Sequence, residues 1–290
     1  METQHQILTE TALEELLDLL NLKPDSPNRK ILRPLLRPVT RKLAKQVVEF
    51  DRLTGEQGFA AACHWLALQY VRNLKLEGQE NIPPEGPLLV VANHPGVTDF
   101  LCLFAGLNRP DLKVITGERR FLRALPNTSP YILYIDQQPN RRMVGMRLII
   151  RHLQQGGMMH IFPTGRAEPD PAVLPGILGT FANWSRSLEL CVRQAPDTQV
   201  VPALITGTNW RRAVHNPLAH AMRTQREQIR MGGALQFVTQ MLTGIRPVDV
   251  TVTYLPAISG HELLREPETI TARASESLRR LILSRPALLP

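Results

Sequence analysis

The sequence predicts an α/β fold: a mainly parallel, covered sheet with flanking helices, preceded by a small helical N-terminal region. Short apolar runs typical of strands alternate with segments of helical periodicity after about residue 70. The 290 residues suffice for one such domain with an appendage, and the composition (43% hydrophobic, 21% charged) is that of an ordinary globular protein. We therefore expect a helical region over 1–70 and an α/β domain over 71–290.

The expected elements follow from apolar spacing and from Gly and Pro punctuation. Strands are expected around Leu74 and Leu76 and at 87–91, 112–115, 131–135, 158–162, 200–205 and 250–254, and helices at 56–71, 99–107, 141–153, 180–193, 216–243 and 267–283. Strands that alternate with helices favour a parallel sheet that is covered on both faces. Functional side chains in such sheets gather at the carboxyl ends of the strands.

The N-terminal region carries most of the excess positive charge. The net charge is +8, and residues 29–45 hold seven Lys and Arg and no acidic residue. Thr11 to Glu14 have capping-box spacing, which predicts a helix start, and Pro34 and Pro38 predict a bent or broken helical arm after it. A basic amphipathic arm suits an anionic membrane surface. A solvated charged face over a packing stripe explains the pattern equally well.

Several classes of protein are disfavoured. The N-terminus lacks a signal-peptide pattern, and no apolar run approaches the ~20 residues of a membrane-spanning helix. Cys63, Cys102 and Cys191 have no metal-ligand spacing, which suits a reducing cytoplasm and predicts no metal site. The basic arm has no aromatic residue to stack on bases, so no nucleic acid partner is expected. We expect a cytoplasmic protein peripherally associated with the inner face of the membrane.

His94 and Asp99 are the candidate catalytic pair. On a continuous helix, residues five apart diverge by about 140°, at roughly 100° per residue. Pro95 and Gly96 forbid that helix, and the resulting turn lets Asp99 reach the His94 ring. A carboxylate on one ring nitrogen fixes the tautomer and leaves the other nitrogen to take a proton, as a general base does. A turn histidine beside a capping aspartate is the alternative.

Four blocks place this pair in a wider pattern. They are Asn93-His94 with Asp99, Tyr134-Ile135-Asp136 with Asn140-Arg141-Arg142, Ile161 to Arg166, and Val200 to Thr208. From about Leu76 to Pro256 the chain resembles the glycerolipid acyltransferases, the group of glycerol-3-phosphate and lysophosphatidic acid acyltransferases. The resemblance implies a glycerol-3-phosphate acyltransferase-like fold and an O-acyltransferase whose His–four residues–Asp pair is His94 and Asp99.

The implied reaction moves a fatty acyl group from acyl-CoA or acyl-ACP (acyl carrier protein) to a hydroxyl of a glycerol-phosphate or lysophospholipid-type acceptor in phospholipid synthesis. The acyl thioester is a co-substrate, and no cofactor is implied. Backbone N–H groups of the turn at Pro95-Gly96, or of the helix start after it, are expected to stabilise the oxyanion. Two alternatives stay open: acylation of another lipid such as a lyso-aminolipid, and a non-catalytic lipid- or acyl-carrier-binding relative.

The resemblance also implies the acceptor-binding residues. Thr164, Gly165 and Arg166 stand where the family has its acceptor pocket, although the family normally carries Glu at the position of Thr164. Arg166 suits bidentate contact with an acceptor phosphate, and Arg119 or Arg120 is expected to assist. A solvated basic turn is the alternative for Arg119 and Arg120.

Overall fold

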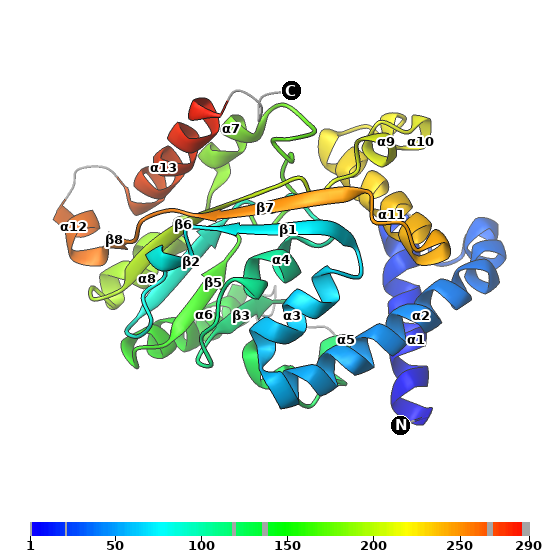
Figure 1. Cartoon of the computed structure of the whole chain (residues 1–290), viewed down its shortest axis with the longest axis horizontal. Helices are drawn as coiled ribbons and strands as arrows, with labels where there is room; N and C mark the ends of the chain where they lie inside the picture. The colour runs from blue at the N-terminus through cyan, green and yellow to red at the C-terminus, as the bar shows by residue number, and fades with distance from the viewer. Residues whose placement is uncertain (1, 21, 118–119, 135–138, 266–268, 286–290) are drawn as a thin grey trace.

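The computed structural model of the chain describes residues 2–20, 22–117, 120–134, 139–265 and 269–285 (Figure 1). In these residues the strands form one sheet in the order β1-β7-β6-β2-β5-β3-β4, and β8 pairs with β6. The strands are β1 (Val71–Glu77), β2 (Leu88–Ala92), β3 (Lys113–Thr116), β4 (Ile132–Tyr134), β5 (Met158–Ile161), β6 (Gln199–Thr206), β7 (Val248–Tyr254) and β8 (Ile258–Ser259). Each strand expected from the sequence is present within a few residues.

The predicted α/β class, with a mainly parallel sheet, is confirmed. Strands β6, β2, β5, β3 and β4 pair in parallel with their neighbours. Strand β7 is antiparallel to β6, and β1 is parallel to β7, so these two strands run against the rest. The carboxyl ends of β2, β5 and β6 therefore meet along one edge of the sheet.

Helices cover both faces of the sheet (Figure 1). They are α1 (Glu2–Leu19), α2 (Pro27–Gln57), α3 (Phe59–Ala67), α4 (Asp99–Ala105), α5 (Arg120–Arg123), α6 (Pro139–Gln154), α7 (Ile177–Thr180), α8 (Ser187–Gln194), α9 (Arg211–Val214), α10 (Pro217–His220), α11 (Gln225–Thr243), α12 (Gly260–Arg265) and α13 (Ile270–Ser284). Short 3-10 turns lie at Gln79–Asn81, Ser129–Tyr131 and Phe181–Asn183. The helix expected over 180–193 is thus divided between α7 and α8.

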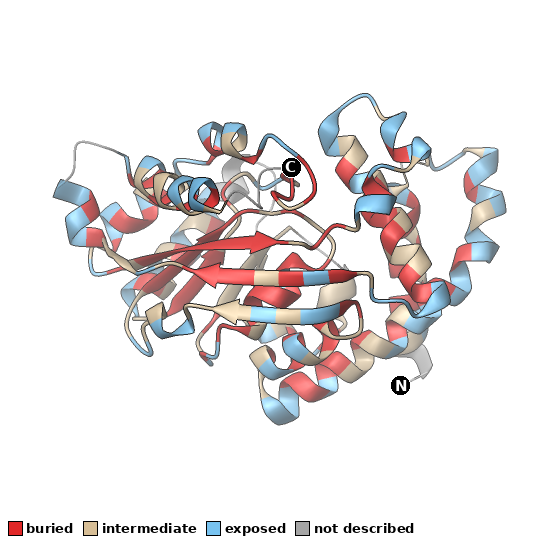
Figure 2. Ribbon diagram, turned by 45° about the horizontal axis from the view of Figure 1, so that its top comes forward, coloured by how far each residue is buried: buried red, intermediate tan, exposed pale blue. Residues whose placement is uncertain are grey.

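Strand β2 lies at the centre of the core. Leu88, Val90 and Ala92 join the cluster packed under α1 to α4, whereas Leu89 and Val91 join the cluster under α6, α8 and α13. Successive side chains of a strand point to opposite faces, so an entirely apolar strand is what a sheet covered on both sides requires. Figure 2 shows the burial along the central strands and the more exposed edge strand β1. The loop after β2 therefore begins at the end of a buried, well-packed strand.

The N-terminal region is helical, but two local predictions for it were wrong. α2 is one unbroken helix of 31 residues, although Pro34 and Pro38 lie inside it. Both prolines are exposed, so water can satisfy the carbonyls that lose a partner. Thr11 lies in the middle of α1 instead of capping it, and its hydroxyl donates to the Ile7 carbonyl oxygen at 2.7 Å.

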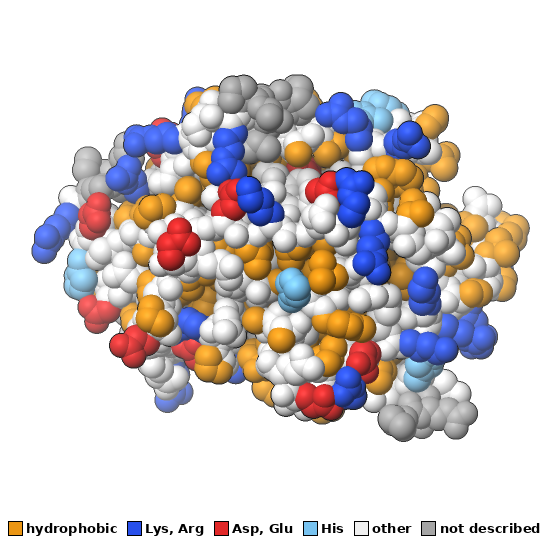
Figure 3. Space-filling model, in the orientation of Figure 1, with side chains coloured by type: hydrophobic (Ala, Val, Ile, Leu, Met, Phe, Trp, Pro, Cys, Tyr) orange, Lys and Arg blue, Asp and Glu red, His pale blue; other side chains and the backbone are white. Residues whose placement is uncertain are grey.

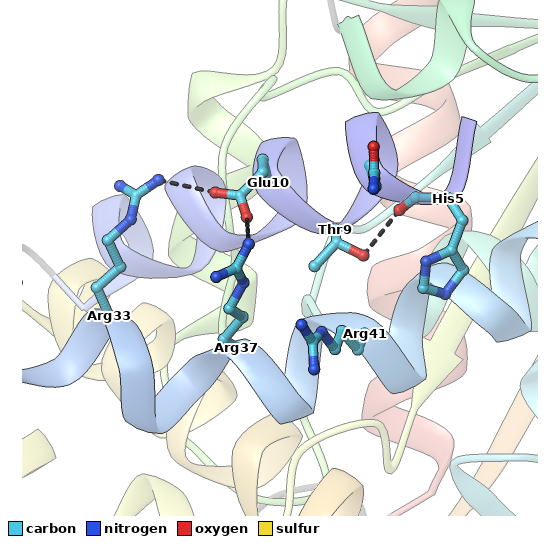
Figure 4. Close-up of a pocket in the computed structure, with 7 residues that line it drawn as sticks. His5, Thr9, Glu10, Arg33, Arg37 and Arg41 are labelled. Atoms are coloured by element: carbon cyan, nitrogen blue, oxygen red, sulfur yellow. Dashed lines mark hydrogen bonds and ion pairs between the residues drawn. The ribbon is translucent and has the colours of Figure 1, made fainter. Parts of the chain in front are cut away.

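Much of the positive charge of α2 is neutralised by α1. Arg29 contacts Glu14 at 2.5 Å and Asp18 at 2.7 Å, and Glu10 bridges Arg33 and Arg37 at 2.8 Å each. Figure 4 shows Glu10 between these two arginines, and Arg41 further along the same groove. The three arginines therefore help to hold α1 and α2 together.

Candidate active site

Three loops meet at the carboxyl edge of the sheet. His94 lies two residues beyond β2, residues 162–168 follow β5, and Gly207 to Asn209 follow β6. In parallel sheets this edge is where ligands bind. Strand pairing alone brings the three loops together, because β5 and β6 both flank β2.

The predicted contact between His94 and Asp99 is present. His94 Nδ1 lies 2.6 Å from Asp99 Oδ2, and α4 begins at Asp99. The His94 side chain keeps 31% of its surface exposed, whereas the Asp99 side chain keeps 1%. The intervening turn has Gly96 at φ +107° and Val97 at φ +45°, a left-handed conformation that a β-branched residue rarely adopts. The turn is thus held in a strained shape that aims the ring outward.

Asp99 is fixed by two backbone donors as well as by the ring. Gly96 N–H donates to Oδ2 at 2.7 Å and Phe100 N–H donates to Oδ1 at 2.6 Å. Because these donors are engaged, they are not available to an oxyanion. The N–H groups of this turn that are expected to stabilise an oxyanion therefore do not include Gly96 and Phe100, whose role is to orient the carboxylate.

The electrostatics of the pair favour the protonated ring. Burial lowers the pKa of His94, but the charge and hydrogen bond of Asp99, with the charge of Glu168, more than offset it, so the pKa lies above its ordinary value. Burial raises the pKa of Asp99, yet the attraction of His94 and the two N–H donors hold it below its usual range. Only the neutral ring can accept a proton, and it predominates above the raised pKa. The fraction of protein with a competent base therefore falls as the pH decreases through that pKa.

We predict that Asp99→Asn lowers the pKa of His94, because burial persists while the neighbouring charge is lost. The titration of the ring resonances by NMR measures this shift. The ring resonances of the exposed His64 serve as the internal control. Identical His94 titration curves would contradict the coupling.

Glu168 supports His94 and was missed by the sequence analysis. Its Oε2 accepts the His94 N–H at 2.9 Å, and its own N–H donates to the His94 carbonyl oxygen at 2.8 Å. Oε1 accepts from Thr180 at 2.7 Å and from the Trp184 indole at 3.2 Å. The chain leaves the helical conformation at Trp184 (φ −65°, ψ 135°), which explains the gap between α7 and α8. Burial raises the pKa of Glu168, although these hydrogen bonds oppose the shift.

Asp170, also missed, joins the loop after β5 to the loop after β6. This buried carboxylate accepts from Ala172 N–H at 3.0 Å, Gly207 N–H at 2.9 Å, the Thr208 hydroxyl at 3.2 Å and Asn209 N–H at 3.0 Å. Burial raises the pKa of Asp170 and the four donors oppose the shift. A fully buried carboxylate needs such donors, so the loops are held in one arrangement.

Two asparagine side chains complete the connection to the His94 loop. Asn93 donates to the Ile205 carbonyl oxygen at 2.9 Å and accepts its N–H at 2.8 Å, so it extends the pairing between β2 and β6. Asn209 donates to the Pro95 carbonyl oxygen at 2.8 Å. The residues on both sides of His94 are thus fixed by β6 and its loop.

Aromatic rings line the inner side of the His94 ring. Phe162 stacks on it with centroids 4.3 Å apart and an interplanar angle of 15°, and the His160 ring meets Phe162 edge-on at 4.3 Å. Burial lowers the pKa of His160 to about 3, so this second histidine is neutral near pH 7. Only His94 of these two combines a carboxylate contact with an exposed ring.

The expected acceptor residues are partly brought together. Thr164, Arg166 and Glu168 line a cavity of about 410 Å³, and Thr164 Oγ1 donates to the Arg166 carbonyl oxygen at 2.9 Å. Gly165, at φ +58°, forms the left-handed turn between them. The expected contributions of Arg119 and of the Arg120 side chain lie outside the described residues. Where the structure is described, no group of three or more His, Cys, Asp or Glu is arranged to hold a metal ion.

Comparison with known proteins bears on this site. Residues 73–206, which include His94, Asp99 and Arg166, match the family model described as Acyltransferase. No curated protein matches the chain. Among solved structures, the chain is similar to that of 1-acyl-sn-glycerophosphate (LPA) acyltransferase, PlsC, from Thermotoga maritima, with 17% identity, a TM-score of 0.49, and coverage of 98% of this chain and 94% of that chain. The match over residues 73–206 supports the resemblance to an acyltransferase found in the sequence blocks.

Proposed function

We propose that the protein is an O-acyltransferase that moves a fatty acyl group from acyl-CoA or acyl-ACP to a hydroxyl of a glycerol-phosphate or lysophospholipid-type acceptor. The observation that carries this proposal is the 2.6 Å contact between the partly exposed His94 ring and the buried Asp99 carboxylate. A binding protein has no need of a base held in this way, so the pair argues against a non-catalytic relative.

In the proposed mechanism, His94 Nε2 takes the proton of the acceptor hydroxyl while Nδ1–H donates to Asp99. The acceptor oxygen attacks the thioester carbonyl carbon, and an oxygen–carbon bond forms. The carbon–sulfur bond then breaks, and the thiolate leaves with the proton from the imidazolium. An ester and a free thiol result, with no covalent acyl-enzyme. Asp99 stabilises the charged ring during the transfer and keeps its tautomer.

The proposed acceptor carries an anionic headgroup, which Arg166 holds. This arginine lines the 410 Å³ cavity next to Glu168, and Glu168 in turn binds the His94 backbone at 2.9 Å. The cavity and the base therefore share one supporting side chain. Guanidinium groups bind phosphate bidentately. A lyso-aminolipid is the second candidate acceptor, because its carboxylate suits the same group.

We also propose that the protein associates peripherally with the inner face of the membrane through residues 29–45. Lys30, Arg41 and Lys45 of this segment are exposed, as are Ile31 and Leu35, at 63% and 64%. Figure 3 shows hydrophobic side chains at the end of the molecule where α2 begins, with Lys and Arg beside them. No helix in the described ranges has the length and apolar character needed to cross a bilayer. Cations beside exposed apolar side chains favour an anionic lipid surface.

The test is a turnover assay with purified protein. Acyl-CoA and acyl-ACP are each supplied with glycerol 3-phosphate, lysophosphatidate, a lyso-aminolipid or no acceptor, and free thiol and lipid products are followed by a thiol reagent and mass spectrometry. Acceptor-dependent thiol release with one new ester per thiol is expected. Thiol release at the rate without enzyme for every pair of substrates would contradict the proposal.

A further inference from the structure

The cavity beside Glu168 contains a second arginine that belongs to none of the four sequence blocks. Arg226, in the first turn of α11, lines the cavity with Arg166, Thr164, Thr180 and Asn183. The family match ends at Thr206, so α11 lies in a part of the chain beyond it. The two arginines come from segments sixty residues apart and face one space.

The charge of this cavity is available to a ligand. Within the described residues, neither Arg166 nor Arg226 forms an ion pair with a carboxylate. The one carboxylate in the lining, Glu168, is 1% exposed, and its oxygens already accept hydrogen bonds from His94, Thr180 and Trp184. Its charge is therefore directed into the protein, whereas the two guanidinium groups are exposed.

The position of Arg226 is held by its neighbours. The preceding residue, Gln225, donates to the Pro175 carbonyl oxygen at 3.0 Å, which ties the start of α11 to the loop after β5. The first turn of α11 is capped by Thr224, with Glu227 in a reciprocal capping box, so the Glu227 carboxylate is engaged by the Thr224 N–H at 3.2 Å. The backbone that carries Arg226 is thus held in place beside the cavity.

We propose that Arg226 and Arg166 form a two-arginine clamp for the acceptor headgroup, and that Arg226 selects acceptors with a phosphate monoester over zwitterionic acceptors. A phosphate monoester carries close to two negative charges at pH 7, with oxygens enough for two guanidinium groups. A phosphodiester with a cationic substituent carries no net charge and brings that cation toward Arg226. The inference rests on the proposed function and adds a specificity residue to it.

The kinetic test compares Arg226→Ala with the wild-type protein. The variant should raise the KM for glycerol 3-phosphate or lysophosphatidate about ten- to hundred-fold, the effect of losing a charge-assisted hydrogen bond to a ligand. The kcat and the KM for acyl-CoA should change less than about three-fold, and any activity on lysophosphatidylcholine should stay the same or rise, because the repulsion between its cation and Arg226 is removed. Arg226→Lys should recover part of the affinity, because it restores the charge without the bidentate geometry.

The matched control is Arg230→Ala, which removes an exposed arginine one turn further along α11 and outside the cavity lining. It should behave as wild type. An Arg226→Ala protein with unchanged KM for the phosphate monoester, or with the same loss on all acceptors, overturns the inference. Thermal unfolding of each variant, expected to match wild type, excludes loss of fold as the cause.

A binding measurement separates this inference from the proposed function. Calorimetric titration of glycerol 3-phosphate into His94→Ala, with and without Arg226→Ala, needs no turnover. Arg226-dependent binding, together with no acyl transfer by the wild-type protein, supports the clamp and refutes the transferase. Turnover on phosphate monoesters with binding and KM independent of Arg226 refutes the clamp and leaves the transferase standing.

Discussion

Replacing His94 by Ala is expected to lower acyl transfer about 10²- to 10⁴-fold, the usual contribution of a positioned general base. The fold should persist, since the ring is partly exposed and Asp99 keeps its two backbone donors, Gly96 and Phe100. Initial rates of thiol release at saturating acyl donor measure the loss, and circular dichroism verifies the fold.

The matched control for this variant is His64→Ala, which removes an exposed histidine from α3. It should keep the wild-type rate. If His94→Ala also keeps most of the activity with both acyl-CoA and acyl-ACP, His94 is not the base. The residual activity of a true base variant should rise with pH, because solvent hydroxide then removes the proton in place of the ring.

Replacing Asp170 by Ala is expected to lower the free energy of unfolding by about 3 kcal/mol, a large effect for one substitution. The variant leaves the donors of the buried Thr208 and Asn209, and those of the partly buried Ala172 and Gly207, without an acceptor. Activity should fall as well, because Asn209 also holds the Pro95 carbonyl next to His94. Urea unfolding measures the stability and the turnover assay measures the activity.

Asp170→Asn keeps the shape of the side chain but turns an NH₂ group toward N–H donors, so we expect it to destabilise as well, though less than Ala. The exposed Asp25 provides the control, since Asp25→Ala removes a carboxylate that holds no buried donor. Equal unfolding midpoints for the wild type and Asp170→Ala would show that the four hydrogen bonds contribute nothing net to stability.

The sheet and the His94 turn could be predicted because their signals are local. Each strand is an apolar run bounded by turn residues, and the contact with Asp99 depends on a break within five residues. The roles of Glu168 and Asp170 could not be predicted in this way. Glu168 meets His94 across 74 positions and Asp170 meets Asn209 across 39, so only the folded sheet brings these groups together. The sequence offered one indication of their role, which is that both carboxylates lie in a short proline-rich loop, 163–171, directly after a predicted strand.

The pairing of the two N-terminal helices, in contrast, could have been predicted from a local pattern in the sequence. Glu10, Glu14 and Asp18 recur every four residues on α1, as Arg29, Arg33 and Arg37 do on α2. Two complementary stripes of this spacing predict an antiparallel helix pair. The prediction of a free basic arm over 29–45 did not take these three acidic residues into account, and it therefore missed the pairing of α1 with α2.

The pairing of β1 with β7 determines how late in synthesis the sheet can be completed. Arg72 of β1 and Asp249 of β7 form an ion pair across 177 positions, and where the structure is described β1 lies at the sheet margin with β7 as its neighbour. A ribosome that adds about 5–20 residues per second needs roughly 9–35 s to synthesise these 177 residues. Throughout this interval the nascent β1 has an unpaired hydrogen-bonding edge, and the sheet is not complete until β7 (Val248–Tyr254) has emerged.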